Sequence, residues 1–141
     1  MPKSKMLSIA VDSGACDNVI DAEELPAYTV TQTKDSMSGD AFLSATGEEI
    51  LNLGEIRVPM LTREDTFRNM KSCAAAVSKP LASVRKIVAA GHRVVFDDVS
   101  YIENKTTGEI NYLREESGNY ILDVWVPPPS GNMGFAWPSN P

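Results

Sequence analysis

The chain has few of the residues that bind metals or nucleic acids. Its 141 residues include two cysteines, Cys16 and Cys73, and one histidine, His92. These are too few and too far apart in the sequence for a zinc site. The net charge is −6 and the one adjacent basic pair is Arg85-Lys86, whereas nucleic-acid binding needs clustered cations on one face. We therefore expect no metal, no cofactor and no nucleic-acid partner.

A long apolar segment is also lacking. No run approaches the roughly 20 apolar residues that span a bilayer. The apolar stretch after Lys3 and Lys5 ends at Asp12, too soon for the apolar part of a secretory signal. We therefore expect a cytoplasmic protein with no membrane partner, in which a disulfide is not favoured. At 141 residues, 43% of them hydrophobic, the chain can form one domain with its own core.

Short strands separated by turn residues dominate the pattern, and they predict an all-β fold, either a small barrel or a sandwich. Residues 66–77 are compatible with a strand or a helix, and residues 34–40 are expected to form a loop. Thr46-Gly47 and Ser117-Gly118 are expected turns between strands. The segments with strand character are residues 8–11, 28–33, 42–45, 49–53, 55–61, 93–96, 99–103, 109–113 and 120–126.

One short helix is predicted before residue 91. Ser78 is its expected N-cap, and Pro80 falls in its first turn. Gly91 is the expected residue just after its C-terminus. The apolar residues that recur at helical spacing are Leu81, Val84, Ile87 and Val88.

The predicted domain covers residues 1–126. Pro127-Pro128-Pro129 ends the regular pattern, and the residues that follow are rich in glycine, asparagine, proline and serine. Residues 127–141 are therefore expected to form a flexible tail.

A possible catalytic motif follows the first apolar run, Ile9-Ala10-Val11. Asp12-Ser13-Gly14 places a carboxylate at the exit of a buried strand, and Gly14 permits a sharp reversal of the backbone directly after it. The same three residues also make an ordinary turn, in which Asp12 accepts hydrogen bonds from nearby backbone N–H groups. The triplet alone does not decide between the two interpretations.

Three segments together resemble the retropepsins, the retroviral-type aspartic proteases, in their copia-type retrotransposon members. "DSGACDNVI", which begins at Asp12, resembles the active-site strand and loop. "FLSATGEEILNLGEIRV" resembles the flap region, with its tip at Ala45, Thr46 and Gly47. "VSKPLASVRKIVAAGHRVVF" resembles the segment through the single helix. The resemblance covers roughly residues 7–126. It departs from the family at Pro80-Leu81-Ala82, where better-known members have two apolar residues and a glycine.

The resemblance implies an aspartic endopeptidase that hydrolyses peptide bonds in a retroelement polyprotein. It also implies a small closed barrel of the retropepsin type with one short helix. Catalysis by this route needs two carboxylates that share one proton across a water molecule. Because the chain has one such motif, the resemblance implies a homodimer in which each subunit supplies Asp12 as the catalytic residue.

Supporting residues follow from the same resemblance. Ser13 corresponds to the residue whose hydroxyl bonds across the dimer and locks the two loops, and Gly14 to the residue that lets the partner backbone come close. Ala15, Asp17 and Val19 correspond to residues that line the substrate cleft. The two flaps are expected to close over an extended polypeptide, which binds as an added strand.

Other interpretations of these residues stay open. Asp17 is equally compatible with a solvated loop acid, Cys16 is expected to be a small buried filler, and His92 an exposed strand residue. One alternative function is a catalytically inactive, domesticated form of the same barrel, acting as a dimerisation or peptide-binding module. Another is an unrelated small barrel in which Asp12 is a turn residue.

Overall fold

The computed structural model describes residues 4–39, 41–43 and 49–129 of the chain, and most of its regular structure is β-strand. Two short α-helices are present in this part, α1 (Lys34–Met37) and α2 (Val84–Ala89), with one 3-10 turn, η1 (Ala22–Glu24). Within these ranges no helix is long and apolar enough to cross a membrane. The strands are β1 (Lys5–Asp12), β2 (Val19–Ile20), β3 (Ala41–Leu43), β4 (Glu49–Leu51), β5 (Gly54–Thr62), β6 (Phe67–Ala74), β7 (Leu81–Ser83), β8 (His92–Val95), β9 (Ser100–Asn104), β10 (Ile110–Glu116) and β11 (Asn119–Val126).

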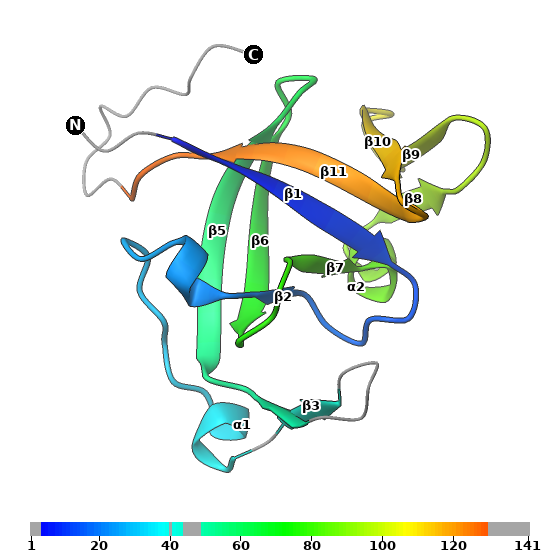
Figure 1. The fold of residues 1–141 in the computed structure, drawn as a ribbon. Helices are drawn as coiled ribbons and strands as arrows, with labels where there is room; N and C mark the ends of the chain where they lie inside the picture. The colour runs from blue at the N-terminus through cyan, green and yellow to red at the C-terminus, as the bar shows by residue number, and fades with distance from the viewer. Residues whose placement is uncertain (1–3, 40, 44–48, 130–141) are drawn as a thin grey trace.

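Six strands pair around a closed ring, in the order β1-β7-β2-β6-β5-β11 (Figure 1). The ring closes because β1 pairs on both of its edges. On one edge it is antiparallel to β11, from Lys5↔Val126 to Ala10↔Ile121. On the other edge its last three residues, which end at Asp12, lie parallel to β7. The strand that carries Asp12 is therefore held from both sides.

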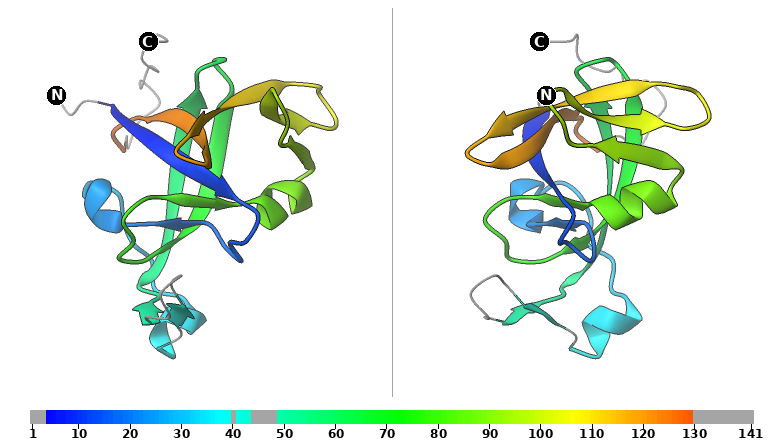
Figure 2. Two further views of the ribbon diagram at one scale, coloured as in Figure 1. Left: turned by 45° about the vertical axis from the view of Figure 1, so that its right-hand side comes forward. Right: turned by 90° about the vertical axis from the view of Figure 1, so that its right-hand side faces the viewer.

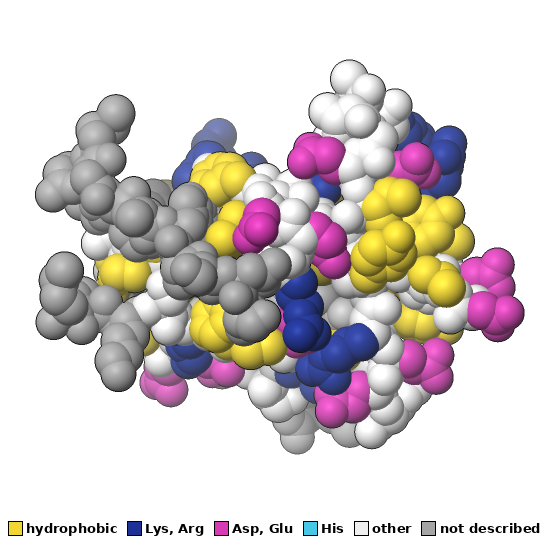
Figure 3. All heavy atoms as spheres, turned by 90° about the horizontal axis from the view of Figure 1, so that it is seen from above, with side chains coloured by type: hydrophobic (Ala, Val, Ile, Leu, Met, Phe, Trp, Pro, Cys, Tyr) yellow, Lys and Arg dark blue, Asp and Glu magenta, His cyan; other side chains and the backbone are white. Residues whose placement is uncertain are grey.

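The rest of the sheet extends from β11 through β10 and β9 to β8, and α2 lies between β7 and β8 in the chain (Figure 2). Ser117 and Gly118 have φ angles of 51° and 81°, as a two-residue type I′ hairpin turn requires. Seen from above, hydrophobic side chains gather on the right-hand side of the molecule, where this extension lies (Figure 3). The large exposed apolar residues of this part of the chain are Phe96, Val99 and Tyr112.

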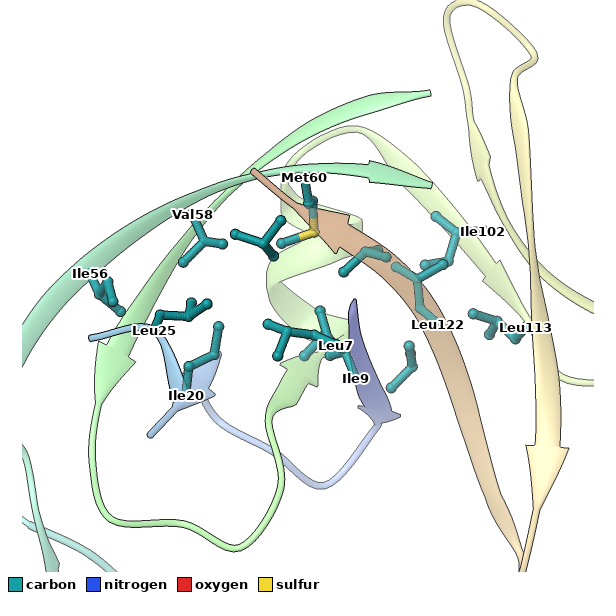
Figure 4. Packing of buried hydrophobic residues seen from close by; sticks show 14 of the residues in the cluster. Leu7, Ile9, Ile20, Leu25, Ile56, Val58, Met60, Ile102, Leu113 and Leu122 are labelled. Atoms are coloured by element: carbon teal, nitrogen blue, oxygen red, sulfur yellow. The ribbon is translucent and has the colours of Figure 1, made fainter. Parts of the chain in front are cut away.

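One hydrophobic core fills the ring and continues to Ile102 of β9 and Leu113 of β10 (Figure 4). In β1 the inward residues Leu7 and Ile9 alternate with Ser8, as expected of a strand with one apolar face. Ile56 and Val58 of β5 are fully buried opposite them. Burial of each such side chain stabilises the fold by about 1.5–3 kcal/mol, so the alternation fixes the register of both strands.

The strand predicted at residues 28–33 is wrong. Only Thr31 pairs there, in an isolated bridge to Glu55. Thr33 caps α1 instead, because its side chain accepts the backbone N–H of Ser36 while the Ser36 side chain accepts the Thr33 N–H. This reciprocal capping box outweighs the strand preference of the β-branched residues. It also places a helical turn where a loop was expected.

The predicted helix start is also wrong. The N-cap of α2 is Ser83, not Ser78, and Leu81–Ser83 form the strand β7. The backbone N–H of Ala10 donates to the Pro80 carbonyl at 3.0 Å, so pairing with β1 extends this segment. Gly91 follows the helix with a φ of 95°, which confirms its expected position.

The structure also tests the predictions for residues 66–77, the hairpin and the C-terminal segment. Residues 66–77 contain a strand, β6, and the expected hairpin has β3 paired antiparallel with β4. The mostly β architecture is therefore confirmed. In the predicted tail, residues 127–129 have no regular structure, and residues 130–141 lie outside the described residues.

A buried ion pair joins β1, β10 and β11. Asp123 is 4% exposed and accepts hydrogen bonds from Arg114 Nε at 2.6 Å and from Ser8 Oγ at 2.7 Å. Burial alone would raise the pKa of Asp123, but the hydrogen bonds from Arg114 and Ser8 outweigh it, so this pKa lies below its usual value. The ionised carboxylate therefore stabilises the fold.

Replacing Asp123 with asparagine should lower the free energy of unfolding by about 1–3 kcal/mol at pH 7, because the buried carboxylate loses its charge-assisted hydrogen bonds to the Arg114 guanidinium. The low pKa in the folded state means that this stabilisation is present above about pH 4 and is lost as the pH falls further. Urea unfolding at pH 7 and pH 3 measures both effects, and the D123N variant should show less acid destabilisation than the wild type.

Glu116→Gln is the matched control. Glu116 also pairs with Arg114, at 3.0 Å, but its side chain is 62% exposed, so its loss should cost less than about 1 kcal/mol. Equal losses in the two variants at pH 7 would contradict a special role for the buried pair.

Candidate active site

Asp12 is the last residue of β1, and its side chain is exposed. One carboxylate oxygen, Oδ1, accepts the backbone N–H of Gly14 at 2.7 Å. The Ala15 N–H approaches the Asp12 carbonyl at 3.4 Å. Among the described residues none donates a hydrogen bond to the second carboxylate oxygen. The carboxylate is thus oriented through Oδ1.

Ser13 and Gly14 form a turn directly after β1, in which the Ala15 N–H donates to the Asp12 carbonyl, so the chain reverses here as expected. The φ of Gly14 is not positive, so the glycine matters for space rather than for a left-handed backbone. A Cβ added at this position would lie 3.3 Å from Asp12 Oδ1. Any side chain here would therefore crowd the carboxylate that the Gly14 N–H holds.

Ser83 ties the loop after Asp12 to β7. It is fully buried, and its Oγ donates to the Ala15 carbonyl at 2.8 Å and accepts the Lys86 N–H as the helix cap. The Ser83 N–H donates to Asn18 Oδ1 at 2.8 Å, and Asn18 Nδ2 reaches the Lys71 carbonyl at 3.0 Å. One serine thus fixes the loop, the strand and the start of α2. The sequence analysis missed it, although a serine directly before Val84 is itself an N-cap signal.

Asp17 faces β6 and α2. Its Oδ1 accepts the Asn18 N–H at 2.9 Å and lies 3.8 Å from Lys86 Nζ, and its Oδ2 accepts the Cys73 thiol at 3.3 Å. Burial first, and then the hydrogen bond to Asp17, raise the pKa of Cys73 to about 12. Cys73 is therefore a neutral thiol rather than a nucleophile.

The other expected site residues occupy different environments. Ala15 is half-buried and bound through its carbonyl, and Val19 is buried, at 6% exposure, in β2. Cys16 is exposed, so the expectation that it fills a buried space is wrong. Cys16 and Cys73 are both free thiols.

The predicted flap tip, Ala45, Thr46 and Gly47, lies outside the described residues. The arms on either side of it are β3 and β4, which pair from Ala41↔Leu51 to Leu43↔Glu49. In Figures 1 and 2 the loop of residues 13–18 lies in the lower half of the molecule, above this hairpin.

The departure at Pro80-Leu81-Ala82 leaves the backbone path intact. Leu81 and Ala82 pair in parallel with Ala10 and Val11, and Ala82 is buried at 4% exposure. The absence of a glycine here therefore does not displace β7 from the strand that carries Asp12.

The arrangement offers one exposed carboxylate, Asp12, and the described residues place no second acid in hydrogen-bond contact with it. The other acid of the loop, Asp17, is occupied by Cys73 and Lys86. In the described ranges no cluster of three histidine, cysteine or acidic side chains could hold a metal ion. Comparisons with protein-family models, with curated proteins and with solved structures found no match. The case for a function therefore depends on the geometry and on the resemblance in sequence.

Replacing Ser83 with alanine should lower the free energy of unfolding by about 1–2 kcal/mol, because a helix cap and a buried hydrogen bond are lost together. The amide protons of residues 13–18 should also exchange faster, because the Ala15 carbonyl loses its donor. Urea unfolding and hydrogen exchange measure the two effects. Ser78→Ala is the control, since Ser78 is exposed, and it should change neither. Unchanged exchange in S83A would show that Ser83 does not hold the loop.

Proposed function

We propose that this chain is an aspartic endopeptidase of the retropepsin-like type, active as a homodimer. The observation that carries the proposal is the exposed Asp12 carboxylate at the end of β1, oriented by the Gly14 N–H and held beside β7. An ordinary turn residue would also accept the Gly14 N–H, but it does not need a place on a strand that is paired along both edges. The second support is the sequence resemblance to the retropepsins, in which an aspartate at this place in the motif is catalytic.

The chemistry requires a second Asp12 from another copy of the chain. One carboxylate, ionised, takes a proton from a water molecule, while the other, protonated, donates a hydrogen bond to the scissile carbonyl. The water oxygen then bonds to the carbonyl carbon, and the C–N bond breaks as the leaving nitrogen gains a proton. Two carboxyl groups that face each other across one water molecule cannot both ionise easily, because their negative charges repel. The pair therefore retains one proton.

The surroundings of Asp12 are compatible with such a dimer. Asp12, Ser13 and Gly14 are all exposed in the single chain, so they are free to meet the same residues of a second copy. In this proposal the Ser13 hydroxyl bonds across the twofold axis and Gly14 allows the two backbones to approach. The small retropepsin-type barrel would then be the closed ring of six strands.

The substrate in this proposal is an extended segment of a retroelement polyprotein. It would add as a strand between the Asp12 pair and the β3–β4 hairpins of the two subunits. Ala15 and Asp17 lie in the loop beside Asp12, and Val19 opens β2 after it. An inactive barrel that binds peptide without cutting it is the outcome if the assays below show no cleavage.

Asp12→Asn should abolish peptidase activity and leave the fold and the association of subunits intact, because it removes the base and also the repulsion between two carboxylates. Asp97→Asn is a matched control, since Asp97 is also exposed and accepts a backbone N–H, from Asp98 at 2.8 Å. The D97N variant should keep full activity. Cleavage of an extended peptide, with and without a pepstatin-type inhibitor, is the measurement. Full activity in D12N would remove Asp12 from the mechanism.

The pH–rate profile should be bell-shaped, with its maximum between about pH 4 and 6. Cleavage needs one charged and one protonated carboxylate, so the fully ionised pair and the fully protonated pair are both inactive. Sedimentation at each pH would separate loss of chemistry from loss of the dimer. A rate that still rises through about pH 8, or one that a metal chelator abolishes, would contradict the carboxylate pair.

A further inference from the structure

A cavity of about 280 Å³ lies between β6 and α2, apart from Asp12. Its floor is formed by four residues of the hydrophobic core, Ile9, Met60, Ile102 and Leu122. Asp12, Ser13 and Gly14 do not line it. Asp17, in the loop after Asp12, is part of the lining, so the opening borders the proposed peptidase site without containing the Asp12 carboxylate.

The cavity exists because one edge of β6 has no neighbouring strand over most of its length. β5 pairs with all of β6, whereas β2 reaches only Cys73 and Ala74. In the described part of the chain, α2 faces the uncovered portion, and the small side chains of Ala82 and Ala90 line the cavity there. A helix beside small residues leaves the space that a longer strand would fill.

A half-buried guanidinium lies in the wall of the cavity. Arg68 donates from Nε and Nη2 to Asn111 Oδ1, at 3.0 and 2.7 Å, and its Nη1 lies 2.7 Å from His92 Nε2. The backbone carbonyl of Ile87 lies 3.2 Å from His92 Nδ1, so Nδ1 carries the proton and Nε2 accepts from Arg68. Burial and the neighbouring Arg68 lower the pKa of His92, which keeps the imidazole neutral.

Arg68 therefore has neutral hydrogen-bond partners and no ion pair. No carboxylate of the described residues lies within 4.0 Å of it, whereas Lys71 and Lys86, which also line the cavity, have Glu55 and Asp17 as partners. Burial lowers the pKa of Arg68, and Glu109 opposes this only by longer-range attraction. Buried charges are ordinarily paired, and two of the five guanidinium N–H donors remain unused.

We propose that this cavity binds a small amphiphilic carboxylate, a carboxylic acid with an unbranched apolar chain. The ligand's carboxylate accepts hydrogen bonds from the two unused N–H donors of Arg68. A guanidinium is well suited to such a bidentate pair with a carboxylate. The chain lies over the apolar floor beside Met60 and Met70. The volume equals roughly nine water molecules at about 30 Å³ each, which limits the ligand to about eight to ten heavy atoms.

The test is a titration of the full chain, labelled with ¹³C at its methionine methyl groups, with octanoate. Met60 and Met70 line the cavity, while Met6 and Met37 are exposed elsewhere, at 45% and 72%. Octanoate should shift the Met60 and Met70 signals in a saturable way and leave Met6 and Met37 unchanged. 1-Octanol has the same chain without the charge and should bind at least about tenfold more weakly, because a charge-assisted hydrogen bond is lost.

Two variants assign the binding to this cavity. Arg68→Gln should weaken octanoate binding at least about tenfold and change octanol binding little. Ala90→Phe should abolish the binding of both, because Ala90 is an exposed residue at the rim and a large side chain there closes the cavity. If R68Q does not fold, A90F alone decides whether the ligand occupies this cavity.

Several results would overturn the proposal: no shift at Met60 and Met70, equal affinity for octanoate and octanol, equal shifts at Met6 and Met37, or undiminished binding in A90F. Asp12→Asn should bind octanoate as the wild type does. The site therefore stands or fails independently of the peptidase proposal.

Discussion

The parallel pairing of residues 10–12 with residues 81–83 is the contact on which the rest of the structure depends. It closes the ring of strands, because β1 would otherwise have only β11 beside it. It also brings Ser83 under the loop that follows Asp12, so that one buried serine holds the loop and starts α2. The position of α2 in turn forms one wall of the cavity beside β6.

The placement of charge distinguishes two sites from the rest of the described structure. The buried Asp123 forms an ion pair with Arg114, and the half-buried Asp17 forms one with Lys86. Asp12 shares with Asp97 its exposure and a hydrogen bond from a backbone N–H, but Asp12 ends a strand that is paired along both edges. Arg68 is different because it is half-buried and held by neutral groups. Each has hydrogen-bonding capacity that no described residue uses.

Sequence patterns predict the elements that local chemistry determines. The β10–β11 turn at Ser117-Gly118 and the end of α2 at Gly91 are of this kind. Residues 28–33 were predicted wrongly, because a capping box at Thr33 outweighs the preference of β-branched residues for strands. Asp12 is visible in the sequence because its neighbours form a compact motif. The group formed by Arg68, His92 and Asn111 is not, because its members come from three strands far apart in the sequence and each alone is an ordinary polar residue.

The central claim is that two copies of the chain bring their Asp12 carboxylates together, and a crystal structure of the protein at acid pH tests it most directly. The account predicts two chains related by a twofold axis, with the two carboxylates about 3 Å apart and the Ser13 side chains in contact with the opposite subunit. Chains that pack with their Asp12 residues apart, each carboxylate surrounded by solvent, would contradict it.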